Sequence, residues 1–91
     1  IPDSVNYIGE GAFQDNQLTE IQIPISVSRI GKWAFAMNQL TSVSLHENIT
    51  QLHAATFRYN RIREIELPEG ITRIGAEALA NNLLERVYIP D

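Results

Sequence analysis

The sequence predicts an α/β solenoid, a right-handed superhelix of four stacked 22-residue coils. Three observations predict it: proline and asparagine each recur at this spacing, and apolar residues recur between them. A constant period of this length means that each coil buries its apolar face only against neighbouring coils. We expect a parallel sheet on one face and short helical segments on the other. The recurring positions are Pro2, Pro24, Pro68 and Pro90, with His46 at the remaining point, and Asn16, Asn38, Asn60 and Asn82.

The predicted coils cover residues 2–23, 24–45, 46–67 and 68–89 of a single domain that spans 1–91. Ile1 matches the last position of a coil, and the pair Pro90-Asp91 matches the first two positions of another. We therefore interpret the chain as a slice of a longer array.

The composition favours a folded protein that binds neither nucleic acid nor membranes. Hydrophobic residues make up 44% of the chain and charged residues 20%, which is ordinary for a globular fold. The net charge is −4, and the seven basic residues form no cluster, which argues against a nucleic acid or anionic membrane partner. No apolar run approaches the roughly 18 residues of a membrane span. The absence of cysteine excludes disulfides and thiolate metal sites.

Stacking the coils aligns apolar residues into columns, which predicts a continuous dry interior. The columns begin at Val5, Ile8, Phe13, Leu18, Ile21 and Ile23, and a column of small residues consists of Ala12, Ala34, Thr56 and Ala78.

One short strand is expected in each coil. The segment Thr19–Ile23 alternates polar and apolar residues and is rich in isoleucine and threonine. Proline follows this segment in most coils and ends it, because proline cannot donate a hydrogen bond to a sheet. A second extended piece, Val5–Ile8, is expected on another side of the coil. The equivalents of the first segment are Thr41–Leu45, Arg63–Leu67 and Glu85–Ile89.

Glycine follows the second extended piece at Gly9, Gly31 and Gly75. Glycine at this position suggests either a left-handed backbone or a close approach of the backbone to its neighbour. The run 10–15 after Gly9 is compatible with a helix. His53 stands where the third coil lacks glycine; we interpret it as a replacement rather than a metal ligand, because His46 lies elsewhere on the coil.

The asparagine column has a functional interpretation, recognition on a surface, and a structural one, a buried ladder. Each asparagine precedes a core leucine or isoleucine by two residues. This position favours the ladder, with each side-chain amide bonded to backbone groups of its own and the next coil.

These motifs resemble the BspA-like leucine-rich repeat family of bacterial surface proteins. The pattern P-x-S-V-x-x-I-G-x-x-A-F-x-x-N-x-L-x-x-I-x-I is nearly complete in 2–23 and 24–45, and the resemblance covers the whole chain. It implies an extracellular or cell-surface protein with an adhesion or host-binding role. Because the shared motif is scaffold, it assigns no binding residue.

Two departures from the family pattern have consequences. Ordinary leucine-rich repeats carry a ladder asparagine three residues after the strand, where this chain has Ser26, Asn48 and Gly70. The polar ladder is therefore expected at the Asn16 column instead. The third coil lacks the usual proline, glycine and small alanine, so it is predicted to be the most irregular.

No catalytic site is predicted, and no cofactor or metal. Two histidines without cysteine or a nucleophile motif leave no pair of nucleophile and base. Glu64 and Glu66 point the same way from one strand, but the register places Glu64 beside Arg86 and Arg63 beside Glu85. We interpret these residues as exposed ion pairs, and the chain as non-enzymatic.

The outward strand positions are the first candidate binding surface. They differ from coil to coil while the inward positions stay apolar, as expected of a face that recognises a ligand or is merely solvated. These residues are Glu20, Gln22, Ser42, Ser44, Glu64, Glu66, Arg86 and Tyr88.

Trp33 and Met37, with Tyr59 in the next coil, are an alternative binding patch on the predicted helical side. Tryptophan, methionine and tyrosine are frequent at interfaces. In the alternative interpretation, Trp33 lies across Ala54 and Ala55 and fills the space that these small residues leave.

Two functions remain open from the sequence. The chain is a recognition module that binds a protein or glycan through its strand face, or it is a structural spacer with no ligand of its own. Uncapped terminal coils are also expected to expose Val5, Ile8, Val87 and Ile89, which predicts end-to-end self-association.

Overall fold

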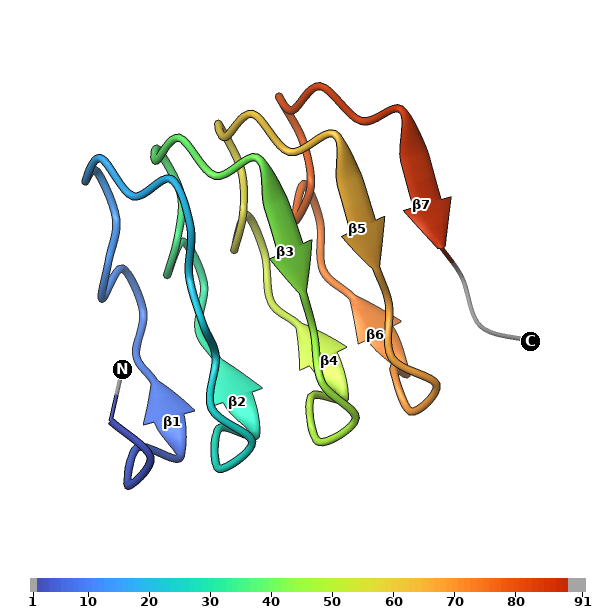
Figure 1. Ribbon diagram of the computed structural model, residues 1–91. Coiled ribbons are helices and arrows are strands. Elements are labelled where there is room, and N and C mark those ends of the chain that lie inside the picture. Colours follow the sequence, from blue (N-terminus) through green and yellow to red (C-terminus); the bar gives the residue numbers. More distant parts are fainter. Residues whose placement is uncertain (1, 89–91) are drawn as a thin grey trace.

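The computed structural model describes residues 2–88, and the side chain of Tyr88 lies outside this description, as does Ile89. The coils lie side by side in sequence order, with β1 near one end of the stack and β7 at the other (Figure 1). Parallel strands join successive coils. This arrangement fits a repeat solenoid, in which contacts run mainly between sequence neighbours.

The first row of strands forms a three-stranded parallel sheet in the order β3-β5-β7. Its strands are β3 (Ser42–Ser44), β5 (Glu64–Glu66) and β7 (Arg86–Tyr88). Val43 pairs with Ile65, and Ile65 with Val87, so the inward positions of the three strands are in register. Val43 and Ile65 are buried while the residues beside them are exposed, as the alternating sequence predicted.

The strand predicted in the first coil, Thr19–Ile23, does not form. Among the described residues, no backbone hydrogen bond joins 19–23 to 41–45. The nearest backbone bond between these coils runs from the Gln39 N–H to the Leu18 carbonyl, at 2.8 Å. A strand requires a partner, and after residue 18 the segment 42–44 pairs with 64–66 but forms no ladder with 19–23. Alternation in the sequence does not indicate which segments pair.

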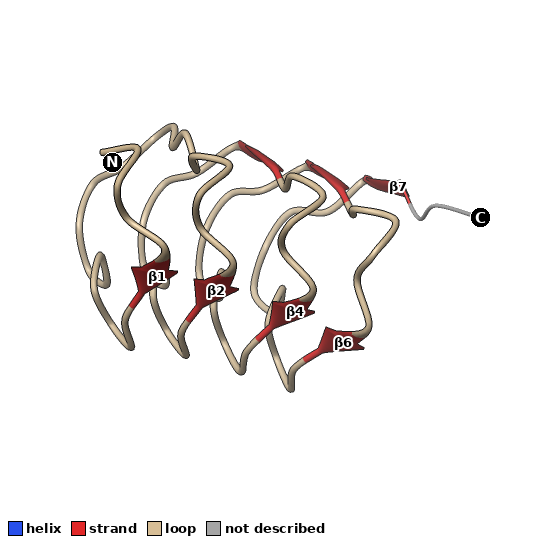
Figure 2. Cartoon of the chain, turned by 90° about the horizontal axis from the view of Figure 1, so that it is seen from below, coloured by secondary structure: helices blue, strands red, loops and turns tan. Residues whose placement is uncertain are grey.

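A second row of four short strands runs along another side of the coils (Figure 2). These strands correspond to the second extended piece of each coil. They pair in parallel as two separate sheets, β1-β2 and β4-β6. Their bounds are β1 (Tyr7–Ile8), β2 (Arg29–Ile30), β4 (Gln51–Leu52) and β6 (Arg73–Ile74).

The break between β2 and β4 coincides with His53. A Cβ atom on Gly31 would lie 2.7 Å from the Glu10 backbone nitrogen, and one on Gly75 would lie 2.6 Å from the Ala54 nitrogen. These contacts are too short for a real side chain, so glycine allows the coils to approach where sheets form. The equivalent position in the third coil is His53, which carries a Cβ, and β2 and β4 form no ladder there. The prediction of an irregular third coil is confirmed at this position.

The predicted helical segments are wrong: residues 2–88 contain turns where helices were expected. The N–H groups of Trp33, Phe35 and Met37 donate to carbonyls of the next coil, whereas those of Ala34 and Ala36 close turns with residues three positions earlier. An α-helix would need all of these groups for its own i→i−4 bonds. Trp33 and Met37 also have left-handed φ values of 60° and 58°, which no α-helix contains. Bonds between coils therefore replace bonds within a helix.

The core lies between the strand rows and this turn-rich side. Phe13 stacks on Phe35 with ring centroids 5.3 Å apart, and Phe35 stacks on Phe57 at 5.6 Å. Phe35 and Phe57 are fully buried. The predicted columns are confirmed in the middle coils, while the last coil exposes Ile74, Leu84 and Val87.

Candidate functional site

The outward residues of β3, β5 and β7, together with the equivalent residues of segment 19–23, which forms no strand, make up a set of exposed polar side chains. Ser42 and Ser44 flank buried Val43, and Glu64 and Glu66 flank buried Ile65. Glu20, Gln22 and Arg86 are exposed as well. The Tyr88 side chain, predicted to belong to this surface, lies outside the described part of the chain. We call the described set the strand face; it comprises Glu20, Gln22, Ser42, Ser44, Glu64, Glu66 and Arg86.

Two openings adjoin each other on the strand face. The first has a volume of about 430 Å³ and lies between the first coil and β3. The second, of about 190 Å³, lies over β3 and β5. Ser42 and Ser44 line both openings, so the two are continuous across β3. The first is lined by Glu20, Ile21, Gln22, Ser42 and Ser44, and the second by Ser42, Val43, Ser44, Glu64, Ile65 and Glu66.

The charges of the strand face are mostly acidic. Arg86 lies 3.9 Å from Glu64, and Arg63 lies 4.0 Å from Glu85, as the register predicted. All four side chains are more than half exposed, so each pair stabilises the fold by no more than a few tenths of a kcal/mol. These pairs are surface features, and Glu64 remains accessible to a ligand.

The asparagine column forms a hydrogen-bonded ladder. The Asn38 amide nitrogen donates to the carbonyls of Phe35 and Ala36 in its own coil and of Phe13 in the preceding coil. Its oxygen accepts the Leu18 N–H at 3.1 Å. Asn38 is only 7% exposed, so these backbone groups have little access to water. Asn60 and Asn82 repeat the pattern one and two coils later.

The direction of the ladder differs from the expectation, because each amide bonds to the preceding coil rather than to the next one. The reason is the backbone of the Phe column. The Phe35 N–H donates to Thr56 of the third coil, and the carbonyl of Phe35 faces the same coil, where it accepts the Asn60 amide at 3.0 Å. Asn16 has no described coil before it and bonds only to its own coil. It is correspondingly exposed.

Polar bonds also cross between coils at the position of the usual leucine-rich-repeat asparagine, although the ladder was expected at the Asn16 column. The Ser26 hydroxyl donates to the Val5 carbonyl at 2.6 Å, and the Asn48 amide donates to the Ile25 carbonyl at 2.9 Å. Each bond joins a turn to the preceding coil. In the sequence, the small and polar residue types at this position could have indicated these bonds.

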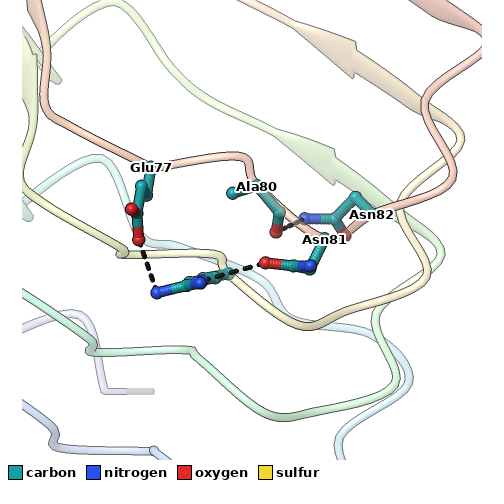
Figure 3. Close-up of polar contacts among 5 residues, drawn as sticks. Glu77, Ala80, Asn81 and Asn82 are labelled. Atoms are coloured by element: carbon teal, nitrogen blue, oxygen red, sulfur yellow. Dashed lines mark hydrogen bonds and ion pairs between the residues drawn. The ribbon is translucent and has the colours of Figure 1, made fainter.

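On the turn-rich side, Arg58, which was not predicted as a site residue, contacts both Trp33 and Tyr59. The Arg58 guanidinium lies over both rings, 5.8 Å from the Trp33 centroid and 4.7 Å from that of Tyr59. It also forms an ion pair with Glu77 and a 3.0 Å hydrogen bond to Asn81; Figure 3 shows these two residues converging from the last coil. In the sequence, the only indication of this role was that Arg58 stands beside an aromatic residue and that the next coil carries an acidic residue.

These contacts give Arg58 a structural role and leave less of this patch free for a partner. Met37 and Tyr59 remain 39% and 42% exposed, whereas Trp33 is half-buried. The packing of Trp33 on Ala54 and Ala55 stays a prediction.

Residues with metal-ligating side chains do not gather in groups of three or more within the described part of the chain. His46 has a local role: its Nδ1 atom accepts the Asn48 N–H at 3.2 Å. His53 lines a small surface opening together with Ser28 and Thr50, where β2 and β4 fail to pair.

A family model described as "BspA type Leucine rich repeat region (6 copies)" matches residues 1–91. The chain belongs to this BspA-type leucine-rich repeat family. The match confirms the resemblance that the repeated motif indicated. No curated protein and no solved structure matches the chain. In residues 2–88 of this BspA-type repeat, no helix is long and apolar enough to cross a membrane.

Proposed function

We propose that this BspA-type repeat segment is a non-catalytic recognition module of a bacterial cell-surface or secreted adhesin-type protein. It binds a protein or glycan partner through the strand face, without a cofactor. The BspA-type family supports a role as a repeat module of surface proteins. The right-handed winding of the coils stays a prediction here, supported by the strong preference of parallel crossover connections for that hand.

One observation carries the proposal: the strand face holds varied polar side chains that the fold does not use. Ser42 and Ser44 form no hydrogen bond through their hydroxyls with described residues, and they line both openings. The side chains of the asparagine ladder, in contrast, already form hydrogen bonds with the backbone of the scaffold. Where side chains make no structural contacts, a repeat protein can change its ligand specificity by substitution with little loss of stability.

The test measures binding of the chain to a panel of extracellular matrix proteins and glycans. The strand-face variant is Ser44→Lys, and the variant with the same charge change on the turn-rich side is Met37→Lys. We expect the first variant to lose capture of the partner and the second to retain it, with both melting near the parent.

The opposite pattern would move the partner surface to Trp33, Met37 and Tyr59. Capture of nothing by the parent chain would support the structural spacer instead. Either result would overturn the proposed strand-face function.

A further inference from the structure

The described segments 19–23 and 41–45 are flanked on both sides by hydrogen bonds between neighbouring coils, and no backbone bond joins them in between. Before them, the Gln39 N–H donates to the Leu18 carbonyl at 2.8 Å. After them, the Asn48 amide donates to the Ile25 carbonyl at 2.9 Å. The about 430 Å³ opening lies between the two segments.

The opening exposes backbone groups of β3 that lack a protein partner. β3 pairs with β5 on one side only, since it is the outer strand of its sheet. Peptide groups alternate in direction along a strand, so half of those in β3 point away from β5 and into the opening. Backbone groups need a hydrogen-bond partner, and here only water or a ligand can supply it.

The two flanking hydrogen bonds limit what can enter the opening. An added strand would need a spacing of about 4.8 Å on each side along its whole length. The bonds at Leu18 and Ile25 join the two segments at both ends and oppose such a separation. The volume is sufficient for one long side chain and the peptide group that bears it.

The side chains that line the two openings favour a positively charged ligand. Glu20 lines the opening, and Glu64 and Glu66 line the adjoining one over β3 and β5. The residues that line the two openings include no lysine, arginine or histidine. Carboxylates, serine hydroxyls and strand carbonyls all accept hydrogen bonds, and an arginine side chain offers five donors in a fixed planar arrangement.

From the shape and the lining of this opening we infer that the site between 19–23 and β3 binds an arginine or lysine side chain on an extended segment of a partner protein. The inference rests on the proposed recognition function of the strand face and specifies its partner as a basic protein segment. The inserted cation contacts Glu20, and its peptide group bonds to the free edge of β3. The neighbouring carboxylates of Glu64 and Glu66 attract further positive charge along the segment.

The experiment uses a fluorescent peptide with two arginines in a glycine–serine background, and matched peptides with glutamine or glutamate in place of arginine. We expect the arginine peptide alone to bind, with an affinity that falls as salt is added. Glu20→Gln is expected to weaken binding by at least about tenfold, because charge-assisted hydrogen bonds are lost. The control Glu10→Gln makes the same charge change at an exposed turn of the first coil and is expected to leave binding unchanged.

Amide hydrogen exchange provides a second readout that is independent of charge. Bound arginine peptide is expected to slow exchange at Ser42 or Ser44 relative to the free protein, and the glutamate peptide is not. Equal weakening by Glu10→Gln and Glu20→Gln would overturn the inference, because it would mean general electrostatic attraction.

The same panel separates this inference from the proposed function. A neutral oligosaccharide that binds the strand face, when no arginine peptide does, would overturn the inference and leave the proposed function standing. If neither class of probe nor any matrix protein binds, both fail.

Discussion

The Asn60 side chain reaches back into the preceding coil and donates to the Phe35 carbonyl at 3.0 Å. Asn38 already donates to that same carbonyl from within the second coil. One backbone oxygen thus joins two coils through two asparagines, and the arrangement recurs at Phe57 with Asn60 and Asn82. The ladder is therefore continuous along the stack and contributes to the contact between coils as well as to the shape of each.

The ladder predicts a graded cost of asparagine removal. Asn38→Ala and Asn60→Ala are each expected to destabilise the fold by about 1–3 kcal/mol, because buried backbone groups lose their partners. Asn16→Ala is the matched control, since Asn16 is exposed and bonds only within its own coil. Denaturant melts measure the midpoints. Equal shifts for Asn16 and Asn60 would contradict a role in joining coils.

The glycine column predicts a similar contrast. Gly31→Ala and Gly75→Ala place a methyl group against the backbone of the preceding coil and are expected to cost about 1–3 kcal/mol. Gly9→Ala is the control, because a Cβ atom there meets nothing within 4 Å. Thermal unfolding of the three variants tests this order. A tolerated Gly75→Ala would mean that the coils can separate without loss.

His53→Gly is expected to let β2 and β4 pair and so to merge the two short sheets. The variant is expected to be more stable by about 1–2 kcal/mol, since several new hydrogen bonds contribute about 1 kcal/mol each and glycine costs about 0.5–1 kcal/mol in backbone entropy. The diagnostic measurement is hydrogen exchange, with newly protected amides expected in 28–30 and 51–53. Unchanged exchange there would show that His53 is not the cause of the break.

Arg58→Ala is expected to destabilise the protein by about 1–2 kcal/mol, because one side chain contacts two aromatic rings and the last coil. Trp33 fluorescence should shift to longer wavelength as water replaces the guanidinium. Arg63→Ala, which breaks only an exposed pair, should change stability by less than about 0.5 kcal/mol. Equal effects of the two variants would remove the structural role assigned to Arg58.

The chain is expected to self-associate through its last coil. Ile74, Leu84 and Val87 are 48%, 37% and 42% exposed, and β6 and β7 are outer strands of their sheets. Light scattering should show a mass that grows with concentration, and Val87→Lys should suppress this growth. Ile8 does not contribute at the other end, contrary to expectation: it is only 3% exposed, since it packs in the core. A monomer at all concentrations would exclude association through these strand edges.

Much of the fold could be predicted because the repeat constrains it. A column that is apolar in every coil, such as the one that contains Ile30 and Leu52, has to face the interior. The asparagine column was identified as structural for the same reason, since a polar residue beside core positions needs backbone partners. The strand face followed from alternation around Val43 and Ile65. For the same reason the outward residues could be named in advance, although their ligand could not.

The tertiary structure alone decided how the coils bond to one another. The sequence 10–15 and its equivalents are compatible with a helix, but alternate N–H groups in these segments donate to the next coil, and that competition depends on a neighbouring coil 22 residues away. The direction of the asparagine ladder depends on which way the Phe35 carbonyl faces. The opening beside β3 and the break at His53 likewise depend on distances between coils. Local pattern determined which residues face inward, and packing between coils determined which backbone groups meet.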